Sequence, residues 1–383
     1  MKLTLLVADL IPPEAFISRR DLPPMPGLQA LLSQAAIQTS GGRFLEEACL
    51  GELGLKVIYT NPIAPLTLLA DGGDPAEHSW LRADPVHLHV SRDNVQLMDS
   101  HVIEPTRDEA NAIAATLNAH LASDGLAIEV RDAARWYLRI PADEMPETTA
   151  LWKISGASVF EQLPRNYGGK INWRGLQNEL QMLLVDHPVN TAREAHGALP
   201  INGIWFWGGG SFQTVRSNIK PANTARMLGV QNSRNEIRPP RLTPPPKNPH
   251  RHELVVAKLA LVRGLAMHYK LPLNNLPASY GALPSSELNT LVVLHSATRA
   301  LRANQRHDWM QAVEALDRDW FLPIQAAFER KAISSLTLLL PNEAASLKAT
   351  VTRPPQWQIW KRFKSTAKPL AAYLPDLPSL PNG

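Results

Sequence analysis

Two kinds of hydrophobic pattern alternate along the chain and predict an α/β fold. Continuous apolar runs are typical of strands that are buried on both faces of a parallel sheet, and they occur at 3–10, 288–295 and 334–341. Apolar residues at helical spacing predict helices between and around these strands, over 26–40, 44–54, 253–269 and 308–330. We therefore expect a mostly parallel sheet with helices on both faces.

The segment 80–150 has a different pattern and predicts a small inserted α+β domain. Residues 85–99 alternate apolar and polar positions on both sides of a turn, which is typical of a hairpin. Thr106 and Glu109 have the spacing of a capping box, and a helix that ends near Gly125 follows them. LAIEVR and WYLRI then predict a second strand pair.

The remaining segments complete the predicted domain organisation. INWRGLQNELQMLLVDHP predicts a helix, and NGIWFWGGGSF predicts a strand that runs into a glycine turn. A discontinuous α/β core is expected from 1–79 and 151–350, interrupted by a proline-rich basic loop at 216–252. Residues 351–383 are expected to form a basic, aromatic tail.

Composition agrees with a globular protein and excludes several classes. The 383 residues are 44% apolar and 19% charged, and they suffice for one large domain or two linked ones. The single cysteine, Cys49, excludes an intrachain disulfide and any metal site of two or more thiolates. No apolar run is long enough for a membrane helix, and the N-terminal run is too short for a signal peptide. We expect a cytoplasmic protein that does not contact membranes.

Positive charge is concentrated in two segments, 216–251 and 344–375. Such segments can remain solvated, or can contact nucleic acid, an anionic partner or the rest of the chain. Within 352–368, Trp357, Trp360 and Phe363 alternate with basic residues. This pattern suits single-stranded nucleic acid, a protein partner, or docking of the aromatic rings on the body of the protein.

The densest group of candidate binding residues lies in HPVNTAREAHGALPINGIWFWGGG, residues 187–210. Asparagine and arginine suit recognition of a small phosphorylated or carboxylated anion, and successive glycines let backbone N–H groups approach a ligand. The candidate ligand-binding residues are His187, Asn190, Arg193, Asn202, Trp205, Trp207, Gly208, Gly209 and Gly210. The alternative is structural: tryptophans that pack, asparagines that satisfy loop backbone, and glycines that allow a tight turn.

This segment resembles the archaeal-type cofactor-independent phosphoglycerate mutases of the alkaline phosphatase superfamily, which carry a pattern near HPxNxxRxxxGxxxANxxWLWGxG. The stretch 83–140 and the turn LLADGGDP are similar to that family's inserted domain and to one of its turns. The chain as a whole resembles the bacterial RpfE-type regulatory proteins, which share ADPVHL, DHPVN, ARE and W-x-W-G-G-G elements. The resemblance implies an alkaline-phosphatase-like fold, and the second family's name implies a role in regulating pathogenicity-factor expression.

The chain departs from the mutases where their chemistry resides. The resemblance implies two divalent metals and a serine nucleophile, but Asp9 has no glycine after it and only Thr60 and Thr67 lie near the nucleophile position. His295 remains from one ligand segment, and Pro341-Asn342 replaces a later Asp-His pair. A two-metal site needs several carboxylate and imidazole ligands. No GxSxG, HExxH or kinase motif offers another catalytic group.

These departures favour a non-catalytic, cytoplasmic regulatory or binding protein on a degenerate mutase-like scaffold. It would hold no metal or cofactor and have no catalytic residues, and it would bind a small anion through the 187–210 segment. Two alternatives stay open. One is a metal-dependent phosphoglycerate mutase or phosphatase with a rearranged site, and the other is a nucleic-acid or protein adaptor that works through 216–251 and 352–368.

Overall fold

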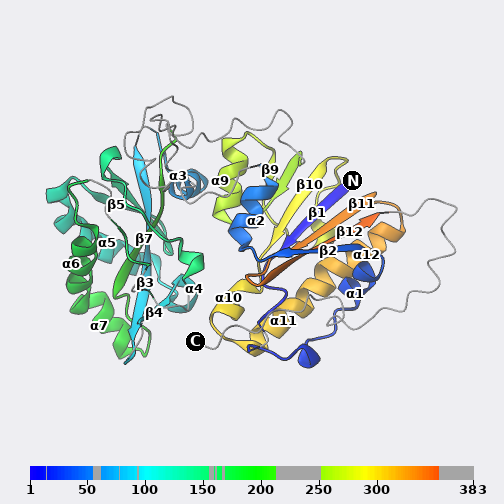
Figure 1. Cartoon of the computed structure of the whole chain (residues 1–383), viewed down its shortest axis with the longest axis horizontal. Coiled ribbons are helices and arrows are strands. Elements are labelled where there is room, and N and C mark those ends of the chain that lie inside the picture. The colour runs from blue at the N-terminus through cyan, green and yellow to red at the C-terminus, as the bar shows by residue number, and fades with distance from the viewer. Residues whose placement is uncertain are drawn as a thin grey trace, which may run out of the picture. The chain divides into compact units, whose positions relative to one another are not determined.

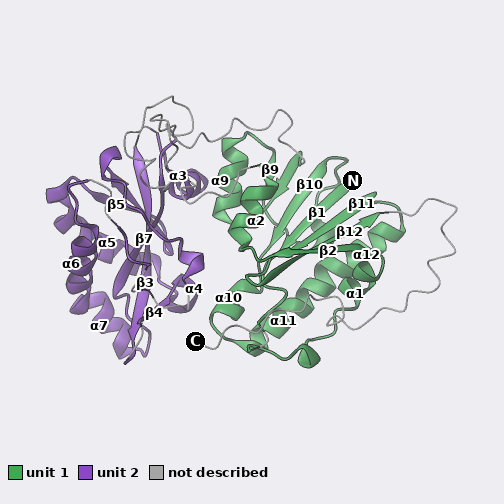
Figure 2. Ribbon diagram, in the orientation of Figure 1, with its two compact units in different colours: residues 1–56, 247–383 green, residues 57–246 purple. Residues whose placement is uncertain are grey.

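The chain divides into two compact units, unit 1 from residues 1–56 and 247–383 and unit 2 from residues 57–246 (Figures 1 and 2). The computed structural model describes residues 1–352 except 14, 55–61, 77, 93–94, 155–158, 160–161, 166–168 and 213–251. Unit 2 is larger than the insert expected at 80–150, since it also takes in residues on both sides of that range. The reason is strand pairing: Gly203–Gly210, expected in the core, pairs with Ser79–Val90.

Unit 1 is built on a seven-stranded, mostly parallel sheet, in agreement with the predicted α/β class. The strand order is β2-β12-β11-β1-β10-β8-β9. The central strand β1 runs parallel to β10 and β11, β8 runs parallel to β10 and β9, and β12 and β2 are antiparallel additions. The strands are β1 (Lys2–Val7), β2 (Ala36–Gly41), β8 (Leu254–Val256), β9 (Leu273–Asn274), β10 (Asn289–Leu294), β11 (Ser335–Leu340) and β12 (Ala345–Thr352).

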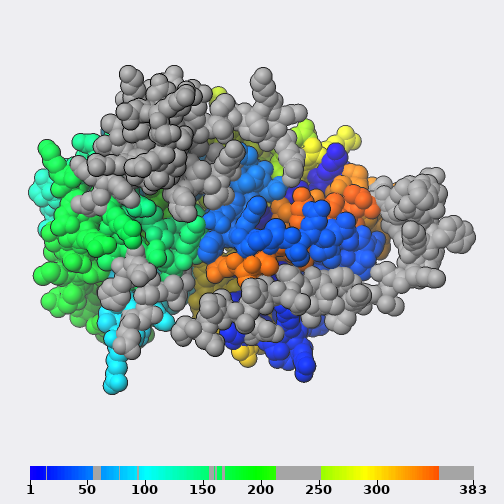
Figure 3. Space-filling view, in the orientation of Figure 1, coloured from blue at the N-terminus to red at the C-terminus, as the bar shows by residue number. Residues whose placement is uncertain are grey.

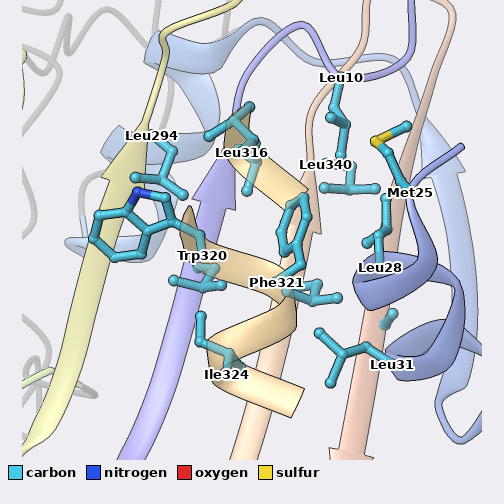
Figure 4. Packing of buried hydrophobic residues seen from close by; sticks show 14 of the residues in the cluster. Leu10, Met25, Leu28, Leu31, Leu294, Leu316, Trp320, Phe321, Ile324 and Leu340 are labelled. Atoms are coloured by element: carbon cyan, nitrogen blue, oxygen red, sulfur yellow. The ribbon is translucent and has the colours of Figure 1, made fainter. Parts of the chain in front are cut away.

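Helices cover this sheet on both sides, and Figure 1 places α1, α11 and α12 on one side and α2 and α9 on the other. On the first side, Phe321 and Ile324 pack toward Leu28 and Leu31 of α1, and the Trp320 ring lies beside Leu294 of β10 (Figure 4). The helical elements are α1 (Pro26–Ser33), α2 (Leu45–Glu52), α9 (Ala260–His268), α10 (Thr298–Arg302), α11 (Arg306–Leu316), the π-helical turn η7 (Asp317–Phe321) and α12 (Leu322–Glu329). Burial of these large apolar side chains supplies most of the stabilisation of the unit.

Two predicted helices of unit 1 are wrong in part. The helix predicted over 26–40 ends at Ser33, and residues 36–41 form the edge strand β2, which pairs with β12. The first part of the helix predicted over 253–269 is instead the short strand β8, and α9 begins only at Ala260. In both cases a strand partner distant in sequence determines the local conformation, which outweighs helical spacing.

Unit 2 contains a five-stranded antiparallel sheet with the order β4-β3-β6-β5, in which β7 pairs with the other edge of β3. The predicted hairpin, the capped helix and the second strand pair are confirmed here. Thr106 Oγ1 accepts from the Glu109 N–H, and a Glu109 carboxylate oxygen accepts from the Thr106 N–H. The elements are α3 (Ile63–Ala70), β3 (Ser79–Val90), β4 (Val95–Met98), α4 (Ser100–Ile103), α5 (Arg107–Leu121), β5 (Ala127–Asp132), β6 (Arg135–Ile140), α6 (Trp173–Val185), α7 (Pro188–Ala195) and β7 (Gly203–Gly210).

The two faces of β7 contact different parts of unit 2. Ile204 and Phe206 pack into the apolar cluster formed with α5 and α6. Trp205 and Trp207 therefore point to the opposite face, since side chains alternate along a strand. Strand β7 is thus buried on both faces, which explains its almost entirely apolar sequence.

Two predicted segments lie outside the described residues. These are the basic segment 216–251 and nearly all of the tail expected at 351–383. The nucleic-acid and protein-partner roles predicted for 216–251 and 352–368 therefore stay predictions.

Candidate functional site

Residues 187–202 connect α6 to β7 through the short helix α7, and their polar side chains hold this connection in place. His187 caps α7: its Nδ1 accepts from the Val189 N–H at 3.2 Å. The neutral ring therefore carries its proton on Nε2, which lies 3.0 Å from Thr116 Oγ1 on α5. Burial lowers the pKa of His187, and this favours the neutral form that acceptance by Nδ1 requires.

Arg193 is buried, and all three of its guanidinium nitrogens are used within unit 2. Nε donates to Leu199 O at 2.7 Å, Nη1 donates to Glu109 Oε2 at 2.8 Å, and Nη2 donates to Ile103 O. Partial burial opposes ionisation of Glu109, but hydrogen bonds from the Thr106 N–H and from Arg193 outweigh it and lower the pKa of this carboxyl. The Arg193 side chain therefore joins α7 to the end of α4 and the start of α5.

The two asparagines hydrogen-bond to backbone groups of α6, of β3 and of the connection before β7. Asn190 Nδ2 donates to Leu184 O at 2.7 Å and to Ile201 O at 2.9 Å, and its Oδ1 accepts from the Ile201 N–H at 2.8 Å. Asn202 Oδ1 accepts from the Leu88 N–H at 2.7 Å and its Nδ2 donates to Leu88 O at 3.1 Å. An unsatisfied buried amide or carbonyl is costly, so these side chains fit the structural alternative that the sequence also allowed.

Trp207 belongs to a buried ionic cluster. Its Nε1 donates to Asp84 Oδ2 at 2.7 Å, and the Arg82 guanidinium lies 5.0 Å from the centre of its ring. Arg82 also binds Asp84 through Nε and Nη2 at 2.7–3.1 Å, and it lies 5.3 Å from the Tyr137 ring. Burial raises the pKa of Asp84, and the contacts with Arg82, Trp207 and the Trp136 N–H oppose that rise.

The three glycines allow the end of β7 to approach α3 and its neighbours closely. A Cβ at Gly210 would lie 2.6 Å from Pro62 Cβ and 2.9 Å from Pro62 Cα, and one at Gly209 would lie 2.3 Å from Met145 Sδ. Gly208 has a φ of 65° and faces Ile63, so a larger residue would be strained as well as crowded. Backbone that is packed this closely has a structural reason for its glycines.

The predicted ligand-binding residues do not converge on one place. Asn202 and Gly210 lie at opposite ends of an eight-residue strand, so about 25 Å of backbone separates them at ~3.3 Å per residue. Arg193 and Asn190 lie on α7, beyond the Asn202 end. Each polar side chain of the set makes contacts within unit 2, and binding of a small anion by this segment stays a prediction.

A second group of titratable side chains lies in unit 1, where the parallel strands end. Asp9 follows β1, Lys258 follows β8, His295 follows β10 and Glu343 follows β11. Because these four strands run parallel, their carboxyl ends meet at one edge of the sheet. Burial and the charge of Asp9 both raise the pKa of Glu343 and of Glu46 on α2, and the same charge opposes the lowering of the His295 pKa by burial.

Three buried polar atoms at this edge have no hydrogen-bond partner in the described part of the chain: Glu46 Oε2, His295 Nε2 and Thr298 Oγ1. Burial raises the pKa of the Glu46 carboxyl and lowers that of His295. Sequence reasoning named Asp9 and His295 here but missed Glu46, Thr298 and Arg302, which match no motif. A rule that inspects the residues after every parallel strand would have found Lys258 and Glu343.

The side chains at this edge do not fit the two divalent metals that the resemblance implies. In the described ranges, no three His, Cys, Asp or Glu side chains are grouped so that they could hold one ion. Asn342 holds the loop after β11: its Nδ2 donates to Ile11 O at 2.7 Å, and its Oδ1 accepts from the Ala344 N–H at 2.9 Å. Thr67, near the expected nucleophile position, is buried in α3, and its Oγ1 donates to Ile63 O at 2.9 Å.

Comparisons with known proteins indicate a distant relationship to phosphoglycerate mutases. The chain is 40% identical over 64 residues to a probable 2,3-bisphosphoglycerate-independent phosphoglycerate mutase of Geobacter sulfurreducens, a match that covers 17% of this chain and 16% of that protein. It is 33% identical over 107 residues to the corresponding mutase of Methanosarcina barkeri, which covers 27% of this chain and 26% of that protein. The matches thus span less than a third of the length of either curated relative. No protein-family profile matches the chain.

The fold is shared over a much larger part of the chain. A solved structure of the PH0037 protein from Pyrococcus horikoshii matches with a TM-score of 0.50 and 12% identity, over 93% of this chain and 88% of that one. The cofactor-independent phosphoglycerate mutase of Thermoplasma acidophilum matches with a TM-score of 0.46 and 14% identity, over 98% and 96% of the two chains. The chain therefore shares its fold with the PH0037 protein, and over part of its length it is distantly related to the curated phosphoglycerate mutases. None of its described helices combines the length and apolarity needed to cross a membrane.

Proposed function

We propose that the protein is a non-catalytic regulatory or binding protein, built on a mutase-like scaffold whose metal chemistry has been lost. The resemblance to RpfE-type regulatory proteins supports the regulatory role. The departures from the mutase motifs support the loss of catalysis, and we place the protein in the cytoplasm.

The observation that carries this proposal is the use of Asn342. The resemblance puts an Asp-His pair of metal ligands after the last parallel strand, and this chain has Pro341-Asn342 there. The Asn342 amide bridges Ile11 O and the N–H of Ala344, and its backbone O accepts from the Arg43 N–H at 2.8 Å. An uncharged side chain whose amide is already bonded to the backbone is a poor ligand for a divalent cation.

Turnover assays test the proposal. With added Mn²⁺ or Zn²⁺, the wild-type protein should show no phosphoglycerate mutase or phosphatase turnover that depends on Asp9. Any background turnover should therefore be the same in the Asp9→Asn variant. Asp21→Asn is the matched control, since Asp21 is an exposed acid of the same unit. Turnover that is lost in Asp9→Asn and retained in Asp21→Asn would refute the proposal.

The second candidate is a metal-dependent mutase or phosphatase with a rearranged site. It is favoured by one observation: Asp9 and His295 lie at the same edge of the sheet. The carboxyl edge of a parallel sheet is where ligands commonly bind, and aspartate and histidine are common metal ligands. The same turnover assays distinguish the two candidates.

A further inference from the structure

The seven-stranded sheet of unit 1 ends in two edge strands, β9 and β2, that differ in length. Strand β9 has two residues and pairs with β8, whereas β2 has six residues and pairs with β12. Proteins protect edge strands by shortness, charge, proline, bulges or a covering element, because an open edge can pair with another chain. Strand β9 is protected by its shortness. The sequence of β2, AIQTSG, has no charge and no proline, and its six pairs with β12 run without a bulge.

The outer side of β2 is open in the part of the chain that the structure describes. Five of its six residues are exposed, and Figure 3 shows the blue of β2 and α2 beside the orange of β12 on the surface of unit 1. Among the described residues, the backbone of 36–41 bonds to β12 and otherwise only to the Ser40 hydroxyl, which lies 3.5 Å from Gly41 O. Because backbone groups alternate in direction along an antiparallel strand, about half of those in β2 point away from β12.

The edge strand β5 of unit 2 shows how the same chain covers such groups elsewhere. Asn118 of α5 bonds to both backbone groups of Ile128: its Nδ2 donates to the O at 2.9 Å, and its Oδ1 accepts from the N–H at 2.7 Å. The Arg107 guanidinium donates to the backbone O of Val130 and of Arg131. No described side chain caps β2 in this way, so its outer edge is available to another strand.

Both ends of β2 are fixed, so the strand is extended before any partner arrives. The Ala35 N–H donates to Leu32 O at 3.1 Å just before the strand, and the Arg43 N–H donates to Asn342 O at 2.8 Å just after it. Between these ends, Ile37 packs against the main apolar cluster of unit 1. A strand that is already ordered loses little conformational entropy when it pairs, which favours association.

We infer that β2 is a self-association edge, which pairs antiparallel with β2 of a second copy of this chain and joins the two sheets across a twofold axis. A second copy fits because it presents the same row of unused backbone groups, and a single symmetric pairing satisfies both rows and closes the assembly. The absence of charge fits as well, since a twofold contact brings side chains close to their own copies, where like charges repel. This inference goes beyond the proposed function and does not depend on it.

The alternation of side chains restricts the register of the pairing. Ile37 and Thr39 lie on one face of β2, and Ala36, Gln38 and Ser40 lie on the other. Directly opposed residues of an antiparallel pair share a face, so the joined sheet keeps its two faces only in registers that match them. When Gln38 lies opposite its own copy, Ile37 lies opposite Thr39, and Ala36 lies opposite Ser40. This register joins β-branched side chains on one face and uncharged small or polar ones on the other.

Sedimentation velocity of the full chain over a series of concentrations tests the inference. The wild type should shift from one chain mass to two as the concentration rises, because a single six-residue ladder makes a small interface. Gln38→Lys should abolish the dimer, because it places two lysines opposite each other at the axis. Gln311→Lys, the same substitution at an exposed position of α11, is the matched control and should dimerise as the wild type does.

Two results of this experiment would overturn the inference. One is a wild-type chain that stays monomeric throughout the series. The other is a dimer that a folded Gln38→Lys variant retains, since such a dimer uses another surface. Amide hydrogen exchange identifies a further occupant: a monomer in which every amide of β2 is protected has another segment of its own chain along this edge, and this result also contradicts pairing with a second copy.

A cysteine variant keeps the inference testable if Gln38→Lys unfolds. Directly opposed residues of an antiparallel pair have Cα atoms about 4.5–5.5 Å apart, a separation that a disulfide can span. Gln38→Cys should therefore form a covalent dimer on mild oxidation, seen by non-reducing electrophoresis. The wild type, in which Cys49 is buried, and Gln311→Cys should form none. If folded Gln38→Cys forms no more covalent dimer than Gln311→Cys, the inference fails.

Discussion

Replacement of Arg193 by alanine separates the structural account of the 187–210 segment from the ligand-binding one. The variant loses three hydrogen bonds, to Leu199 O, Ile103 O and the Glu109 carboxylate, from a side chain that is 7% exposed. Two carbonyl oxygens are then left without these donors, and Glu109 loses its charged partner. If the segment is structural, unit 2 should lose stability and no anion affinity should change.

The magnitude follows from the burial of the pair. Removing one partner of a buried ion pair costs roughly 3–5 kcal/mol, and Glu109 keeps 23% side-chain exposure, so water compensates part of the loss. We expect destabilisation of about 3 kcal/mol, which for a unit of this size lowers Tm by about 6–12 °C. Thermal unfolding followed by circular dichroism measures the shift, and amide hydrogen exchange in α5 and α7 locates it.

Arg107→Ala is the matched control for this measurement. Arg107 also donates to two backbone carbonyls, those of Arg131 and Val130, but its side chain is exposed to water. Its loss should cost less than about 1 kcal/mol. An Arg193→Ala variant that keeps the wild-type Tm and loses measurable phosphate or carboxylate binding would refute the structural reasoning and support the ligand site.

Three further variants test other contacts of unit 2. Trp207→Phe removes a hydrogen bond to a buried carboxylate and should lower the free energy of unfolding by about 2 kcal/mol. Trp205→Phe loses a bond to a backbone carbonyl and should lower it by about 1 kcal/mol, and urea unfolding compares the two variants. Gly210→Ala forces a Cβ against a proline and should cost about 1–3 kcal/mol of stability in the same assay. In the control Gly41→Ala, the added Cβ meets no described atom within 4 Å, so the cost should be less than about 1 kcal/mol. Equal effects of the two substitutions would contradict the packing argument. Because the pKa of Glu109 is lowered in the folded protein, its carboxylate stabilises the fold above the ordinary pKa of 4.5, and this stabilisation is lost as the pH falls through the folded pKa. The difference in Tm between the wild type and Glu109→Gln should therefore shrink below pH 4.5. A difference that does not change with pH would contradict this direction.

Local signals were sufficient to predict the elements that depend on neighbouring residues. The capping box at Thr106 and the buried strands β1, β10 and β11 are correct because each signal lies within the element itself. Strand β2 was missed because its residues are mostly exposed, and its partner β12 lies about three hundred residues further along the chain.

The site could be predicted only as residue types. The sequence shows that Arg193 and Asn190 are suited to anions, but it cannot show that Glu109, 84 residues earlier, already pairs with Arg193. Glu46, at the edge where the parallel strands end, was missed for the same reason, because this edge is assembled from elements far apart in sequence and follows no motif. To predict which side chains contact one another, one must know which strands pair as well as the residue types.

The most direct test of the central claim is the metal content of the purified protein, measured by elemental analysis alongside its Tm with and without EDTA. A degenerate scaffold that has lost the metal ligands of the mutases should contain no stoichiometric manganese or zinc, and EDTA should leave its Tm unchanged. Stoichiometric divalent metal that EDTA removes, with a fall in Tm, would contradict the loss of metal chemistry.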